Sequence, residues 1–110
     1  MSSYRNALAV SSDSSEARLA LAAEALASGT GLVLYEGIVA LRCTGKQLLC
    51  EVIDPQPSAR RCENEYEVLV ENSQRLLEAS PLRKHLPDLP CKWLVVDGHG
   101  AGEAVLWPPT

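Results

Sequence analysis

The two apolar segments closest to the end of the chain constrain its fold most. Residues 91–97 and 103–107 flank a five-residue glycine-rich connection and are predicted to pair as a β-hairpin. When this hairpin closes symmetrically, one side carries four large apolar residues: Trp93, Val95, Val105 and Trp107. The other side is apolar too, whereas a strand with helices on only one side normally shows polar residues to water on the other. We therefore expect protein to cover both sides of this hairpin.

The tryptophan side of the hairpin can be buried either by a second protein molecule or by other segments of the same chain. Tryptophan is enriched at the centres of protein interfaces, so we predict a homodimer in which this patch packs against its own copy. Alternatively, the N-terminal segment or the proline-rich residues 80–90 fold over the patch within one chain. A chain that completes its fold only inside a larger complex would show the same patch.

Two segments have the composition and spacing of helices. Residues 16–28 are mostly Ala and Leu, with Asp13 and Glu16 spaced for a capping box and Gly29 placed to end the helix. Ser58 is predicted to cap a second helix that runs to residue 79. The apolar stripe of this helix has spacings of three and four, and its glutamates fall mainly off the stripe, which is typical of a solvated face.

Residues 32–43 and 46–53 are predicted to form a hairpin around Thr44 and Gly45. A two-residue loop places Leu41 opposite Leu48. One side of the hairpin is then apolar: Val39, Leu41, Leu48, Cys50 and Val52. The other side is mixed, and Gly37 interrupts the first strand, which indicates a bulge or a bend.

The order of these elements predicts a single α+β domain over residues 1–110, built as a two-layer sandwich. A short first strand at residues 4–10, the helices and the hairpins give the order βαββαβ with an extra C-terminal strand. This order is that of the ferredoxin-like arrangement, an antiparallel sheet with two helices on one face. If the first strand does not form, an αββαββ layer remains.

The composition argues against several classes of function. Ten Lys and Arg against fourteen Asp and Glu give a net charge of −4, which opposes nucleic-acid binding. No apolar run approaches the roughly 20 residues that cross a bilayer. The start of the chain also lacks the basic flank and apolar stretch of a secretory signal. We therefore predict a cytoplasmic protein that binds neither nucleic acid nor membranes.

The four cysteines, Cys43, Cys50, Cys62 and Cys91, show no zinc-motif spacing to one another or to a histidine. In a reducing compartment disulfides are rare, so we interpret the cysteines as small apolar core residues. We predict no metal site, and no motif indicates a cofactor.

The glycine-rich connection holds the candidate catalytic residues. Gly98, Gly100 and Gly102 permit left-handed turns and leave backbone amides approachable. His99 is the natural proton-transfer residue, and Asp97 is placed to orient it. Unlike a phosphate-binding loop, this connection leads into a strand and not into a helix, and a histidine on such a turn is more often simply solvated.

Arg60 and Arg61 stand at the start of the predicted second helix, where the helix dipole favours acidic residues. With Ser58 they form a candidate anion site, in which backbone amides and guanidinium groups hold a phosphate or a carboxylate. The alternative is that both arginines are solvated and pair with Glu63 or Glu65 at helical spacing.

We interpret these features as those of a non-catalytic binding or regulatory module. It would self-associate through its apolar sheet face and bind a protein partner or a small anionic ligand. No nucleophile, second base or metal set stands beside His99, so an enzyme is the less favoured interpretation. In that alternative, His99 and Asp97 form the proton-transfer pair, and Arg60 and Arg61 hold an anionic metabolite.

Overall fold

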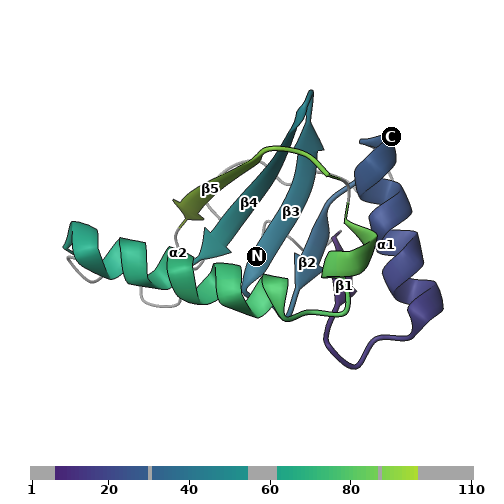
Figure 1. Cartoon of the computed structure of the whole chain (residues 1–110), viewed down its shortest axis with the longest axis horizontal. Helices are drawn as coiled ribbons and strands as arrows, with labels where there is room; N and C mark the ends of the chain where they lie inside the picture. Colours follow the sequence, from purple (N-terminus) through teal and green to yellow (C-terminus); the bar gives the residue numbers. More distant parts are fainter. Residues whose placement is uncertain (1–6, 30, 55–61, 87, 97–110) are drawn as a thin grey trace.

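The computed structural model describes residues 7–29, 31–54, 62–86 and 88–96, which form a five-stranded sheet and two helices (Figure 1). The strands follow the same order in the chain and in the sheet: β1 (Leu8–Val10), β2 (Val33–Tyr35), β3 (Val39–Thr44), β4 (Gln47–Ile53) and β5 (Cys91–Val96). Helix α1 (Glu16–Ser28) comes between β1 and β2. Helix α2 (Glu63–Glu78) and the 3-10 turn η1 (Arg83–His85) come between β4 and β5. The predicted α+β class is confirmed.

The sheet is mixed, so the prediction of an antiparallel sheet is wrong. β1 pairs with β2 in parallel, as β4 does with β5, and only the pairs around β3 are antiparallel. The strand order also differs from a ferredoxin-like sheet, in which the two strands joined by a helix are separated by another strand. Here each helix instead joins two neighbouring parallel strands, which is the geometry of a βαβ unit.

The difference begins at residues 36–38, where the segment predicted as one strand reverses direction. Glu36 and Gly37 both have left-handed φ angles, 54° and 68°. The backbone N–H of Ile38 donates to the carbonyl of Tyr35 at 3.0 Å. Two consecutive left-handed residues make the tight turn that suits the twist of a hairpin. Gly37 therefore marks a complete reversal between β2 and β3, and not the expected bulge or bend.

Both helices cover the same face of the sheet, as expected. Two antiparallel pairings separate β2 from β4, so β4 runs parallel to β1. The two helical connections thus start from equally oriented strands and step in the same direction along the sheet, and right-handed crossovers place both on one face. Helix α1 packs against β1 and β3, and α2 packs against β4 and β5 (Figure 1).

The core lies between this face and the helices. The helices contribute Leu19, Ala22, Leu26 and Leu77. The sheet contributes a larger set: Leu8, Val10, Val33, Tyr35, Val39, Leu41, Leu48 and Cys50. Leu82, in the connection after α2, joins the same cluster and is fully buried.

The β3–β4 hairpin confirms the predicted faces but not the predicted register. Thr44 pairs with Gln47 and Leu41 with Cys50, so the pairing is two residues away from the expected one. A shift of two residues leaves each side chain on its side of the sheet, so the predicted apolar side is kept, and it faces the helices. On the mixed side, Arg42 and Glu51 form an ion pair at 3.3 Å.

The helix ends follow the sequence signals in part. Gly29 closes α1 in a left-handed conformation, as predicted. The N-cap, however, is Ser15 and not Asp13, since the Ser15 hydroxyl accepts the backbone N–H of Arg18 at 3.2 Å. Helix α2 begins at Glu63, and the predicted cap Ser58 lies outside the described residues. Of the predicted first strand, residues 4–6 lie outside the described residues, and residues 8–10 form β1.

Candidate functional site

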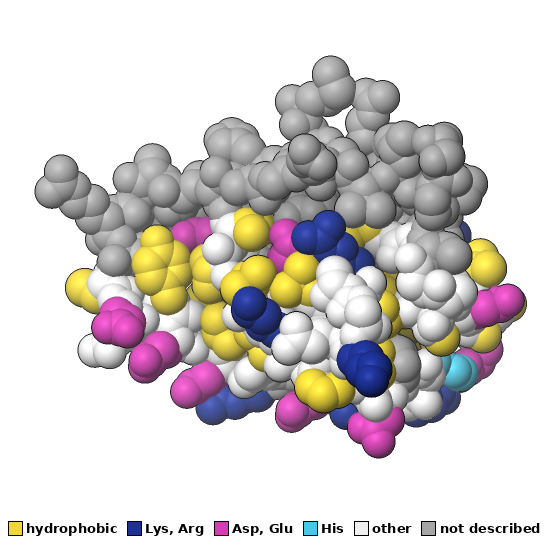
Figure 2. All heavy atoms as spheres, turned by 90° about the horizontal axis from the view of Figure 1, so that it is seen from above, with side chains coloured by type: hydrophobic (Ala, Val, Ile, Leu, Met, Phe, Trp, Pro, Cys, Tyr) yellow, Lys and Arg dark blue, Asp and Glu magenta, His cyan; other side chains and the backbone are white. Residues whose placement is uncertain are grey.

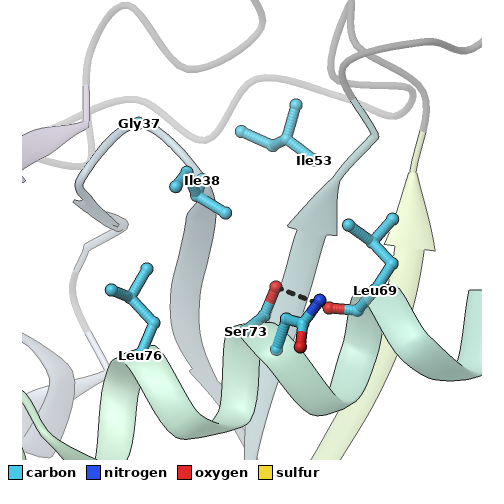
Figure 3. Close-up of a pocket in the computed structure, with 7 residues that line it drawn as sticks. Gly37, Ile38, Ile53, Leu69, Ser73 and Leu76 are labelled. Atoms are coloured by element: carbon cyan, nitrogen blue, oxygen red, sulfur yellow. Dashed lines mark hydrogen bonds between the residues drawn. The ribbon is translucent and has the colours of Figure 1, made fainter.

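A hollow of about 360 Å³ lies between α2, the β2–β3 turn and the end of β4 (Figure 3). Seven residues line it: Gly37, Ile38, Ile53, Leu69, Asn72, Ser73 and Leu76. A volume of this size lies at the lower end of the range of small-molecule sites, which are mostly apolar with a few placed polar groups. The lining fits that description, because four of its seven residues carry large aliphatic side chains.

The sequence builds the wall of this pocket from the spacing of α2. Leu69, Ser73 and Leu76 are four and three residues apart, so they share one side of the helix. The opposite wall comes from the tight turn after β2, which presents Ile38 to solvent with 39 % of its surface exposed. The pocket therefore depends on the reversal at residues 36–38, which the sequence pattern did not reveal.

The polar groups of the pocket differ in their availability. The hydroxyl of Ser73 donates to the backbone carbonyl of Leu69 at 2.9 Å, so its proton is already used within the helix (Figure 3). Asn72 is exposed on the same wall, and its amide has both donors and an acceptor. A ligand in this pocket would thus meet aliphatic side chains and one amide group.

A second notable feature is a pair of cysteines on neighbouring strands. The sulfur atoms of Cys50 on β4 and Cys91 on β5 lie 2.7 Å apart. Cys50 is fully buried and Cys91 is exposed. Burial raises the pKa of the Cys50 thiol well above its ordinary value, and the neighbouring Cys91 and Cys43 raise it further.

These positions correct the interpretation of all four cysteines as core residues. Cys50 is a buried core residue, as predicted. Cys43 is half-buried, and burial raises the pKa of its thiol. Cys62 and Cys91 are exposed. The proximity of Cys50 and Cys91 depends on the parallel pairing of β4 and β5, and the spacing of cysteines along the sequence carries no signal of that pairing.

The connection after α2 is tied to α1 by a small charged cluster. Glu16 accepts from Lys84 at 2.7 Å and lies 2.8 Å from the Nε2 atom of His85. Lys84 first and then His85 lower the pKa of Glu16. His85 is half-buried here and pairs with Glu16, although the sequence alone gave it no structural role. The cluster joins η1 to the first turn of α1.

Trp93 lies on the side of the sheet that the helices cover. It pairs with Cys50 across the β4–β5 ladder, and it is half-buried against the main core. Part of the tryptophan side that was predicted as a homodimer patch is therefore packed against the protein's own core. Val95, two residues further on, is half-buried on the same side, and Leu94 on the opposite side is exposed.

The remaining predicted site residues lie outside the described part of the chain: Ser58, Arg60, Arg61, Asp97, Gly98, His99, Gly100, Gly102, Val105 and Trp107. Their predicted roles stay predictions. Among the described residues, no group of three His, Cys, Asp or Glu side chains could hold a metal ion.

On the part of the face that Figure 2 shows in colour, acidic and basic side chains are interspersed with apolar ones. No described helix is both long and apolar enough to span a membrane. The chain matches no protein-family model, no curated protein and no solved structure.

Proposed function

We propose that the protein is a non-catalytic binding module that holds a small, mainly apolar molecule in the pocket beside α2. One observation carries the proposal: about 360 Å³ of space is lined by aliphatic side chains and a single available amide. This combination suits a ligand with an apolar body and one hydrogen-bonding group that reaches Asn72. Burial of the apolar body supplies the affinity, and the amide contact sets the orientation.

A suitable probe is anilinonaphthalene sulfonate, which has an aromatic body and one anionic acceptor group. For a ligand of this size, an efficiency of about 0.3 kcal/mol per heavy atom corresponds to a Kd on the order of 10–100 μM. Isothermal titration calorimetry on the folded chain should show one binding site in this range. The expected heat-capacity change is negative, because apolar surface is buried.

The pocket can be blocked by one substitution, and the same helix offers a matched control. Leu69→Trp places an indole in the hollow and is expected to weaken dye binding about ten-fold or more. Val68→Trp puts the same group on the adjacent residue, which is 53 % exposed and does not line the pocket. Equal binding by the two variants, with both folded by circular dichroism, would contradict the proposal.

Self-association belongs to the same proposal as a second property of the module. It rests on the apolar residues of the predicted interface, of which Trp93 and Val95 on β5 are only half-buried in one chain. The enzymatic alternative depends on Asp97 and His99, which both lie outside the described residues.

A further inference from the structure

The two cysteines on β4 and β5 are placed for chemistry with each other. In the parallel ladder Leu48 pairs with Cys91 and Cys50 pairs with Trp93, so the two cysteines are diagonal neighbours on the helix-covered side. Their sulfur atoms are 2.7 Å apart, against about 2.05 Å in a disulfide bond. A small rotation of the side chains is therefore enough to join them.

The two thiols differ in their exposure to solvent, so each has a different role in a reaction with a reagent from solution. Cys91 is exposed and lines a hollow of about 110 Å³ beside Trp93, with Arg83 and Glu78 also in its wall. Cys50 lies beneath it with no exposed surface. A reagent from solution can reach the sulfur of Cys91 but not that of Cys50. The opposite charges of Arg83 and Glu78 suit a reagent that carries both a carboxylate and an ammonium group.

We propose that Cys50 and Cys91 form a redox-active dithiol that reduces small zwitterionic disulfides of the glutathione type. The Cys91 thiolate attacks one sulfur of the disulfide, whose S–S bond breaks, and the departing thiolate takes up a proton. Cys50 then attacks the Cys91 sulfur, gives its proton to the second departing thiolate, and closes the Cys50–Cys91 disulfide. Two protein thiols are oxidised, and one small disulfide is reduced to two thiols.

Burial supports this order of steps. Desolvation keeps the Cys50 thiol protonated in the resting protein, so the first attack belongs to the accessible partner. Once Cys91 carries a mixed disulfide, its sulfur is an electrophile in contact with Cys50, and the second step is intramolecular. The inference is independent of the pocket beside α2, since the two sites share no lining residue.

The chain contains its own control for this chemistry. Cys62 is exposed like Cys91, but it stands before α2, and within the described residues its sulfur contacts no other cysteine sulfur. Glutathione disulfide should therefore form a mixed disulfide on Cys62 that persists. The mixed disulfide on Cys91 should disappear about ten-fold faster or more, because Cys50 displaces it.

The experiment treats the reduced full chain with glutathione disulfide, stops samples with acid, and maps the products by peptide mass spectrometry. The expected product is a Cys50–Cys91 cross-link, lighter than the dithiol form by two hydrogen atoms. Cys50→Ala should instead accumulate the glutathione adduct on Cys91. An adduct on Cys91 of the wild-type chain that lasts as long as the one on Cys62 would overturn the proposal, even if Cys50→Ala fails to fold. A cross-link of Cys91 to any cysteine other than Cys50 would overturn it as well.

Discussion

Leu82 stands in a proline-flanked connection, between Pro81 and the turn η1, yet it is fully buried in the main core. Leu82→Ala removes three carbon groups from a site without solvent contact. At about 0.8 kcal/mol for each buried carbon group, the transfer cost alone is about 2.4 kcal/mol. A cavity that does not collapse raises the total to roughly 3–5 kcal/mol.

This loss is a large part of the free energy of unfolding of a typical domain, which is about 5–15 kcal/mol. Urea unfolding followed by far-ultraviolet circular dichroism measures it directly. With a slope of about 1.5 kcal/mol per molar, the unfolding midpoint should fall by about 2 M or more. The slope itself should stay unchanged if the native and unfolded states keep their compactness.

Leu21→Ala is the matched control, because Leu21 lies on α1 with 50 % of its surface exposed. Alanine is a good helix former, so the control should change the free energy of unfolding by no more than about 0.5 kcal/mol. If Leu82→Ala cost no more than Leu21→Ala, the segment after α2 would not be part of the core. The packing of this segment against the helices and the sheet would then be wrong.

Three further predictions concern the helix ends and the assembly. Ser15→Ala should destabilise the protein by about 1 kcal/mol and Asp13→Ala by much less, as measured by urea unfolding, because the hydroxyl of Ser15 caps α1. Glu16→Gln should reduce stability at neutral pH but not in acid. Lys84 and then His85 lower the pKa of Glu16 in the folded state. The contribution of Glu16 to the stability of the fold is therefore present above its ordinary pKa of 4.5 and is lost as the pH falls through the lowered value. Thermal melts of both proteins from pH 3 to 7 at low salt check this. Native mass spectrometry should show a dimer of the purified chain, and a monomer at all concentrations would contradict self-association.

Features with a local cause could be predicted from the sequence. The position of α1 follows from its run of Ala and Leu and from Gly29, which ends it. The apolar side of the β3–β4 hairpin was also correct, even though the register was shifted by two residues. The alternation of side chains determines which residues face the core, whereas the turn determines which residues pair.

Features that depend on long-range pairing or on an unusual backbone angle could not be predicted in this way. Glu36 has a left-handed φ angle that glycine, asparagine or aspartate adopts more readily, so the reversal before β3 had no clear sequence signal. Because that reversal was not predicted, two strands were expected between the helices where the structure has β2, β3 and β4. The parallel pairing of β4 with β5 was therefore also missed. The pocket wall at Ile38 and the contact of Cys50 with Cys91 both depend on these two features.

The order of the sheet has a consequence for how the chain folds. Each described strand after β1 lies beside the strand that precedes it in the chain, either directly or after one helix. The pairings of β2 with β3 and of β3 with β4 close short loops, whereas the pairing of β4 with β5 joins residues as far apart as Leu48 and Cys91. The entropy lost in closing a loop grows with its length. We therefore expect the two helical crossovers to form after the hairpins, because non-local pairing loses loop entropy before its contacts are made.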